Sequence, residues 1–241
     1  MATDLIRFDN VVAGYGSLMI LNGLSFAASQ GEVTLLIGPN GAGKSTVLKT
    51  FFGLLTPRQG DILFQGRRIN GSPPAALLRQ GVAFVPQGRN LFPALSLHQN
   101  LELGGITLPP GTRASRLDEV MEQFPQLKAR RHSLAASLSG GEQKQLEIAR
   151  ALLLRPSVIL IDEPSIGLSP KINQDVFRLL RNLANTGTSV LMVEQNVRSA
   201  LAVSDRVLVL KGGRLVQECP ASELIADPNL NQIFLGRHVA T

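Results

Sequence analysis

Apolar residues follow two different spacings along the chain. Continuous apolar runs, typical of strands buried on both faces, occur at 33–38, 81–87, 157–164 and 188–195. Apolar residues recur at helical spacing over 44–55 and 174–184. Because parallel strands need crossover connections, this alternation of strand and helix patterns predicts an α/β fold with a parallel sheet.

Other strand patterns lie outside this alternating series. Two of them, at 5–16 and 24–31, precede the first buried strand, and a strand and turn follow at 60–69. We expect them to form an N-terminal antiparallel β region beside the parallel or mixed sheet.

Near the end of the chain the pattern predicts a hairpin followed by a helix. Residues 206–218 contain two strand-like runs around a pair of glycines, which is typical of a hairpin. Ser222 is a typical N-cap residue, so a short helix is expected to follow it and to end before Pro228.

The middle of the chain has a different pattern, because no β-type run appears between about residues 95 and 150. Apolar residues at helical spacing predict a helix over 113–130. We therefore expect one domain, in which residues 1–87 and 151–241 form the catalytic core and residues from about 88 to 150 form a helical subdomain.

Charge and composition narrow the possible functions. The chain has 24 Lys and Arg against 18 Asp and Glu, a formal charge of +6, and 5% aromatic residues. The basic residues are dispersed and stacking platforms are few, which argues against nucleic-acid binding. The single cysteine, Cys219, excludes an internal disulfide and fits a reducing compartment. No secretory-signal pattern and no apolar run of roughly 20 residues is present, so we expect an intracellular protein with at most a peripheral membrane role.

A phosphate-binding pattern stands between the first buried strand and a helix. Residues 38–45, GPNGAGKS, match G-x-x-x-x-G-K-[ST], in which glycines let the backbone wrap a phosphate and helix amides point at the anion. Lys44 would neutralise the β- and γ-phosphates, Ser45 would bind Mg²⁺, and Thr46 would donate to an inner phosphate. The predicted nucleotide-binding residues of this loop are Gly38, Pro39, Asn40, Gly41, Ala42, Gly43, Lys44, Ser45 and Thr46.

Two carboxylates end a later buried strand. Asp162 stands where a carboxylate can hold Mg²⁺, and Glu163 follows it directly. Adjacent strand residues point to opposite faces, so the two carboxylates need different roles. Glu163 is the candidate general base for an attacking water, because phosphoryl transfer relies on positioning and electrostatics.

A second Gly-rich helix start precedes these carboxylates. Its residues are Ser139, Gly140, Gly141, Glu142 and Gln143. A Ser-Gly-Gly turn at a helix N-terminus is another anion cradle, and one nucleotide in one chain does not need two. Together, and over nearly the whole chain, these motifs resemble the ATP-binding-cassette (ABC) ATPases. The resemblance implies a P-loop NTPase fold of the RecA-like type, ATP and Mg²⁺ as ligands, and a signature segment, 139–143, that contacts the γ-phosphate bound by the opposite subunit.

The resemblance also assigns roles to single residues. It implies that Tyr15 stacks on adenine and that Gln87 reaches Mg²⁺ and the attacking water. Gln195 stands where a γ-phosphate-sensing histidine is usual; it can donate a hydrogen bond but cannot become cationic. Glu163, Gln87 and Gln195 are therefore the expected catalytic group, and Ser45, Gln87 and Asp162 the expected Mg²⁺ ligands. Ser169 stands where most of these ATPases have an aspartate that links the two subunits.

Residues 88–101 correspond to the region that docks a membrane partner in this family. Phe92 and Leu95 can belong either to that surface or to the core. The sequence alone does not decide between the two.

Several segments in this order resemble one subgroup, the second ATPase subunit of branched-chain amino acid importers and of their urea or amide relatives. The segments are GPNGAGKST, VPQGRNLFP, LSGGEQ, EPSIGLSP, VEQN and the tail SELIADPNLNQIFLG. The subgroup implies a homologous second ATPase subunit, two transmembrane permease subunits and a solute-binding protein as partners. It also implies a peripheral location on the cytoplasmic face of the inner membrane.

Two other functions use the same motifs. A non-transport ABC ATPase of the cofactor-assembly type has a similar length. A nucleotide-binding regulator without turnover would explain the unusual Gln195 and Ser169, although Glu163 counts against it.

Overall fold

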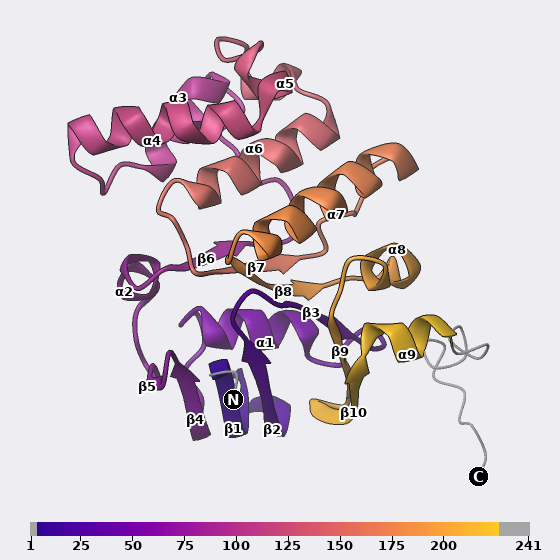
Figure 1. The fold of residues 1–241 in the computed structure, drawn as a ribbon. Coiled ribbons are helices and arrows are strands. Elements are labelled where there is room, and N and C mark those ends of the chain that lie inside the picture. Colours follow the sequence, from indigo (N-terminus) through magenta and orange to yellow (C-terminus); the bar gives the residue numbers. More distant parts are fainter. Residues whose placement is uncertain (1–3, 227–241) are drawn as a thin grey trace.

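The computed structural model describes residues 4–226, and its elements form layers around two β-sheets. Figure 1 shows helices stacked above the larger sheet and the smaller sheet below it. The strands are β1 (Asp4–Tyr15), β2 (Leu18–Ser29), β3 (Val33–Ile37), β4 (Gln59–Phe64), β5 (Arg67–Arg68), β6 (Val82–Val85), β7 (Val158–Asp162), β8 (Ser189–Val193), β9 (Arg206–Lys211) and β10 (Arg214–Pro220).

The larger sheet has the order β10-β9-β3-β8-β7-β6, and the smaller one has the order β2-β1-β4-β5. All neighbours from β9 to β6 are parallel, whereas β10 runs antiparallel to β9. The smaller sheet is antiparallel throughout. The predicted α/β fold, with an antiparallel region beside a mixed sheet, is confirmed.

The helices are α1 (Lys44–Phe51), α2 (Pro74–Arg79), α3 (Leu97–Gly104), α4 (Pro110–Gln123), α5 (Pro125–Lys128), α6 (Gly140–Leu152), α7 (Pro170–Asn185), α8 (Val197–Leu201) and α9 (Ala221–Ala226), with a 3-10 turn, η1 (Ala135–Ser137). Helices α3–α7 form a layer above the larger sheet, whereas α1 lies between the two sheets (Figure 1). Within residues 4–226 no helix combines the length and the apolar character that a membrane crossing requires.

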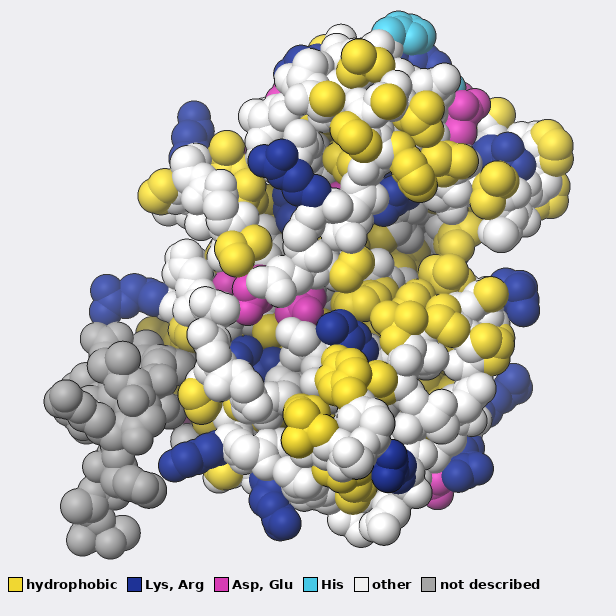
Figure 2. All heavy atoms as spheres, turned by 180° about the vertical axis from the view of Figure 1, so that it is seen from behind, with side chains coloured by type: hydrophobic (Ala, Val, Ile, Leu, Met, Phe, Trp, Pro, Cys, Tyr) yellow, Lys and Arg dark blue, Asp and Glu magenta, His cyan; other side chains and the backbone are white. Residues whose placement is uncertain are grey.

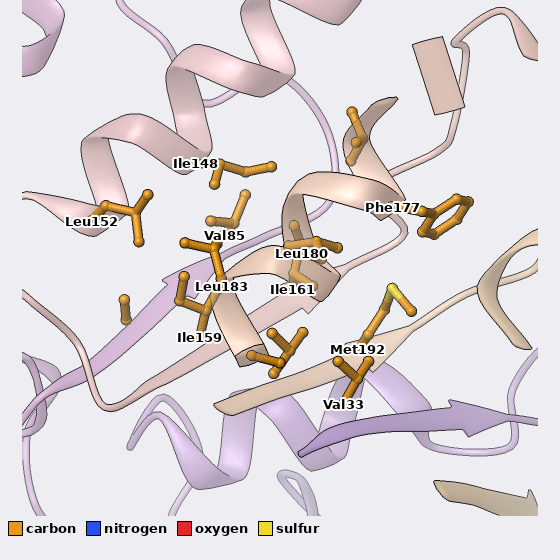
Figure 3. Packing of buried hydrophobic residues seen from close by; sticks show 14 of the residues in the cluster. Val33, Val85, Ile148, Leu152, Ile159, Ile161, Phe177, Leu180, Leu183 and Met192 are labelled. Carbon is orange, nitrogen blue, oxygen red and sulfur yellow. The ribbon is translucent and has the colours of Figure 1, made fainter. Parts of the chain in front are cut away.

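Both faces of the parallel sheet are buried, and consecutive residues of one strand enter different cores. In β7, Ile159 and Ile161 pack with the helices above the sheet, whereas Leu160 packs with α1 and the smaller sheet. Figure 3 shows Ile159 and Ile161 facing Ile148 of α6 and Leu180 of α7. This double burial explains why β7 is a continuous apolar run.

Two helix predictions need correction. The predicted helix over 113–130 is two helices, α4 and α5, which are separated at Phe124. Pro125 has no N–H and its ring clashes with a preceding helical turn, so the periodic pattern could not continue through it. Ser222 is not an N-cap, because α9 begins one residue earlier, at Ala221, whose N–H donates to the Asp205 carbonyl at 3.0 Å. The expected end before Pro228 and the rest of the tail resemblance lie outside the described residues.

The topology brings four chain segments to one edge of the larger sheet. Strands β3, β6, β7 and β8 are parallel, so their carboxyl ends meet at the same edge. Ligands of open α/β sheets bind at this edge. The segments that leave these strands contain most of the candidate site residues.

Candidate functional site

The loop after β3 has a backbone that only glycine allows at two positions. Gly38 has φ 148°, and a Cβ there would lie 2.1 Å from the Leu210 carbonyl oxygen. Gly43, the N-cap of α1, has φ 101°, and no side chain caps the helix start. The first amides of α1 therefore remain available to an anion, as the motif requires.

Lys44 is buried beneath this loop. Its Nζ donates to the carbonyl oxygens of Gly38 at 2.9 Å and Pro39 at 3.1 Å. Burial lowers the pKa of Lys44, and the nearby charges of Glu163 and Asp162 oppose that shift. A phosphate placed in the loop would receive a cation whose position is already defined.

Ser45 and Asp162 meet where α1 begins and β7 ends. The Ser45 hydroxyl donates to Asp162 Oδ1 at 3.1 Å. Asp162 continues the face of β7 that packs against α1, because it lies two residues after Leu160. Burial raises the pKa of Asp162, and the charge of Glu163 acts in the same direction.

A hydroxyl beside a carboxylate fits Mg²⁺, which takes oxygen ligands and commonly uses only one or two protein carboxylates together with substrate phosphates. In the described part of the chain no group of three or more His, Cys, Asp and Glu side chains forms a metal cluster. The donor set therefore suits a Mg²⁺ ion that is shared with a nucleotide and does not suit a zinc site enclosed by protein ligands.

Glu163 lies between two glutamine side chains. Gln87 Nε2 donates to Glu163 Oε2 at 2.7 Å, and Gln195 Nε2 donates to Glu163 Oε1 at 2.6 Å. Glu163 has φ 48°, which non-glycine residues rarely adopt, and its N–H donates to the Val193 carbonyl. The strained backbone turns the carboxylate out of the strand and toward Gln87 and Gln195, which follow β6 and β8.

The signature segment starts α6 with a capping box. Ser139 is the N-cap; Glu142 N–H donates to its Oγ, and Ser139 N–H donates to the Glu142 carboxylate. Arg130 also binds this carboxylate, and Gln143 Nε2 donates to the carbonyl of Leu138. The Ser139 hydroxyl also donates to Glu142 Oε2 at 2.8 Å, so the side chains of Ser139, Glu142 and Gln143 hold the helix start together. The first backbone amides of α6 are then the groups suited to an external anion.

The predicted residues fall into two sets. Asp162, Glu163, Gln87 and Gln195 converge with 38–46 at the carboxyl edge of the sheet. Among the described residues no hydrogen bond or ion pair joins 139–143 to 38–46. The start of α6 instead shares a pocket with segments that follow β6 and β7, lined by Gly88, Arg89, Gly140, Gln143, Lys144, Glu147, Ile166, Gly167 and Leu168.

Tyr15 lies at the exposed end of β1, with 45% of its surface accessible, so it is not a core residue. Lys49 Nζ lies 5.9 Å from its ring centroid and 3.4 Å from its hydroxyl. Sequence reasoning missed Lys49, although it stands four residues after Ser45 and hence on the same face of α1. Its positive charge also acts on Asp162.

A groove separates the helical layer from the lower body of the molecule. Its volume is 470 Å³, and Figure 2 shows hydrophobic side chains gathered where the surface is hollowed between the two parts. The lining residues come from α2, β6, α3, α6 and adjoining loops: Ala75, Leu78, Arg79, Ala83, Phe84, Val85, Pro86, Asn90, Leu103, Gly104, Ile106, Thr107, Leu108, Glu147, Arg150, Ala151 and Leu154. Phe92 does not line this groove but is 51% exposed, and Leu95 is half-buried.

Comparisons with known proteins identify the family and the fold of the chain. The model of the family described as ABC transporter matches residues 21–166. The chain is 39% identical to the high-affinity branched-chain amino acid transport ATP-binding protein BraG of Pseudomonas aeruginosa, over 96% of this chain and 100% of that protein. It is 34% identical to the lipopolysaccharide export system ATP-binding protein LptB of Escherichia coli, over 94% and 95%. Its fold is similar to an ATP-binding cassette of an ABC transporter solved in its ADP conformation, with a TM-score of 0.87, 28% identity and coverage of 98% and 100%.

Proposed function

Since the chain belongs to the ABC transporter family of ATP-hydrolysing subunits, we propose that it energises an importer of branched-chain amino acids. Hydrolysis of ATP to ADP and phosphate coupled to transport follows from the family, whereas the solute is the proposed part. The observation that carries it is the 39% identity to a branched-chain amino acid transport protein over that protein's full length. The 34% identity to a lipopolysaccharide export protein is the competing observation.

In the proposed site, the loop 38–43 and the start of α1 hold the phosphates of ATP. Lys44 supplies the cation, Thr46 donates to an inner phosphate, and Tyr15 stacks on the base. The buried Lys44 and the uncapped helix start support these roles. Ser45, Asp162 and Gln87 would hold Mg²⁺, which when bound neutralises phosphate charge.

Glu163 is the proposed general base. It takes a proton from the water that attacks the γ-phosphate, while the bond from that phosphorus to the bridging oxygen breaks and ADP leaves. The amides of Gln87 and Gln195 orient the carboxylate through hydrogen bonds of 2.7 Å and 2.6 Å. Both side chains are neutral donors, so they orient the carboxylate through hydrogen bonds alone.

A second, homologous ATPase subunit is the proposed dimer partner. Residues 139–143 would act on its nucleotide, in keeping with their hydrogen bonds within α6 and its flanks and with the lack of any such bond to 38–46 among the described residues. Residues from about 88 to 150, which include α3–α5 and most of α6, form the proposed helical subdomain. The proposed location is the cytoplasmic face of the inner membrane, in complex with two permease subunits and a solute-binding protein.

We assign the permease contact to the groove between α2 and α6. Its lining is mainly apolar and contains Arg79, Arg150 and Glu147. Glu147 is buried and already paired with Lys144 at 2.5 Å, so the two arginines are the charges that face a partner. A short amphipathic helix with apolar residues on one face and an acidic residue beside them would complement both features. Membership of a transporter family provides the reason to expect such a segment on a membrane partner.

Co-purification tests the transport function and this contact together. The tagged full-length chain would be expressed in its native cell, extracted in mild detergent and analysed by mass spectrometry. Ile106→Glu places a charge at the groove on a side chain that is 61% exposed, and Val216→Glu does the same on β10 at 56% exposure. We expect the permeases to be lost with Ile106→Glu and retained with Val216→Glu.

The proteins recovered with the unmodified chain discriminate between the functions. Two multi-span permeases, a second ATPase and a solute-binding protein that binds leucine, isoleucine or valine would support the proposal. A binding protein for urea or amides would change the solute, and lipopolysaccharide-export components would replace import by export. Recovery with soluble assembly factors and no membrane protein would refute the transport function.

A further inference from the structure

Glu194 is a buried acidic side chain beside the catalytic group to which sequence reasoning gave no role. It directly follows β8 and is 2% exposed. Its Oε1 accepts a hydrogen bond from Ser165 N at 2.7 Å, and its Oε2 accepts from Ser165 Oγ at 2.9 Å, Gln195 N at 2.9 Å and Asn196 N at 3.0 Å. All four donors are neutral, so these bonds alone compensate the loss of water around the carboxylate.

The four bonds join two different loops. Two donors come from Ser165 in the loop that follows Glu163, and two come from the backbone of the loop that contains Gln195. A local helix cap at the start of α8 would need only the bonds from Gln195 and Asn196. It would not explain why the same carboxylate also binds both donors of Ser165.

Each of the two loops contains a glutamate whose carboxylate accepts hydrogen bonds from the other loop. Glu163, from the loop after β7, accepts from the Gln195 side chain, and Glu194, from the loop after β8, accepts from Ser165. The Glu163 N–H also donates to the Val193 carbonyl. The orientation of the candidate base therefore depends on how these loops are held together on both sides of the strained residue Glu163.

We propose that Glu194 is a positioning residue for ATP hydrolysis: by binding both loops, it fixes Gln195 against Glu163 and so sets the orientation of the general base. This inference rests on the proposed catalytic role of Glu163. Glu194 does not touch nucleotide or water in this scheme and acts through Glu163 alone. Hydrolysis is sensitive to such support, because a displacement of about 1 Å at a reacting group can lower a rate by roughly 100-fold.

Glu194→Gln is the sharpest perturbation of this arrangement. Its side chain keeps the shape of glutamate, but one carboxylate oxygen becomes an NH₂ group that donates instead of accepting. In one amide orientation that group faces Ser165 N–H, and in the other it faces the N–H groups of Gln195 and Asn196. At least one loop must move away in either case.

The experiment measures kcat and KM for ATP with the full-length chain in its transporter complex. We expect Glu194→Gln to lower kcat by about 10- to 100-fold and to leave KM within about twofold, because the loop 38–46 is untouched. Asp205→Asn is the matched control. Asp205 also accepts a backbone bond, from Val33 N at 2.8 Å, and its carboxylate binds Arg181 at 2.6 Å. It lies at the opposite edge of the sheet, so the kcat of Asp205→Asn should stay unchanged.

A double mutant separates positioning from general damage. If Glu194 acts through Glu163, then Glu163→Gln with Glu194→Gln should hydrolyse ATP no more slowly than Glu163→Gln alone. Ser165→Ala removes one donor without changing the charge, and it keeps the inference testable if Glu194→Gln does not fold. We expect Ser165→Ala to lower kcat by about two- to fivefold with KM unchanged.

The failing outcomes can be told apart. If Glu163→Gln retains the unmodified kcat, the proposed base is wrong and the inference falls with it. If Glu163→Gln stalls hydrolysis while Glu194→Gln and Ser165→Ala leave kcat unchanged, only the inference is overturned. A further loss of kcat in the double mutant would show that Glu194 acts by another route.

Discussion

Gly141 provides a direct test of how the signature segment is built. It is the second residue of α6, and a Cβ placed on it would lie 2.4 Å from Cγ2 and 3.0 Å from Cδ1 of Ile172 in α7. The missing side chain therefore lets α6 approach α7 closely, independently of any bound anion. Gly140 differs, because a Cβ there would meet only the flexible end of Leu168, at 3.3 Å.

The magnitude follows from two opposing effects. Ordinary carbon contacts lie near 3.5–4.0 Å, so Gly141→Ala must displace Ile172 by about 1 Å, and over-packing of this kind costs about 1–3 kcal/mol. Alanine in place of glycine in a helix returns about 1 kcal/mol. The net loss is therefore about 0–2 kcal/mol, with a central value near 1, and Tm falls by about 2–4 °C per kcal/mol for a chain of this size.

Thermal unfolding in the Ile172→Ala background makes the test decisive. Removal of both clashing carbon atoms leaves only the helix-propensity effect, so Gly141→Ala should change sign and raise Tm there. Gly140→Ala should shift Tm by less than Gly141→Ala in the unmodified background. An equal loss of Tm from Gly141→Ala in both backgrounds would refute the packing argument.

Three further predictions concern the nucleotide site. Lys44→Ala should weaken ATP binding by roughly 10- to 100-fold in a calorimetric titration, because it removes a charge-assisted bond; unchanged affinity would remove Lys44 from the site. Asp162→Asn should abolish Mg²⁺-dependent hydrolysis yet raise Tm at neutral pH, because the raised pKa of Asp162 means that its ionised form destabilises the folded chain. That gain should shrink as pH falls through the folded-state pKa, and equal Tm values at neutral pH would contradict it. Gln195→His should add a step to the pH dependence of kcat near or above pH 6.5, since Glu163 favours the imidazolium; an unaltered profile would place residue 195 away from the base.

The sequence predicted local elements well where one physical pattern dominated. The double burial of β7 appears as an unbroken apolar run, and the beginning of α6 appears as a Ser-Gly-Gly helix start at Ser139. Both depend on residues close in the chain. The prediction of one helix over 113–130 was wrong, because the periodic pattern was continued through Pro125.

The sequence predicted less well those residue roles that depend on contacts between distant segments of the chain. The sequence does not show whether Glu142 faces a partner or forms a capping box with Ser139 while it also binds Arg130. Only the contacts in the structure separate these cases. Glu194 gave no signal, because a glutamate after a buried strand is common and its donor Ser165 is 29 residues away in the chain. The sequence could have placed Lys49 near the site, because it stands four residues after Ser45 on the same face of a predicted helix.

The sequence by itself determined the α/β class, the phosphate loop and the adjacent carboxylates, since these follow from periodicity and from residue types at fixed short spacings. Tertiary structure alone decided that Gln87, Glu163 and Gln195 form one hydrogen-bonded group and that Glu194 joins the loops around it. These contacts arise where parallel strands β6, β7 and β8 end at a common edge. Their geometry is set by the pairing of strands far apart in the chain, which local patterns do not encode.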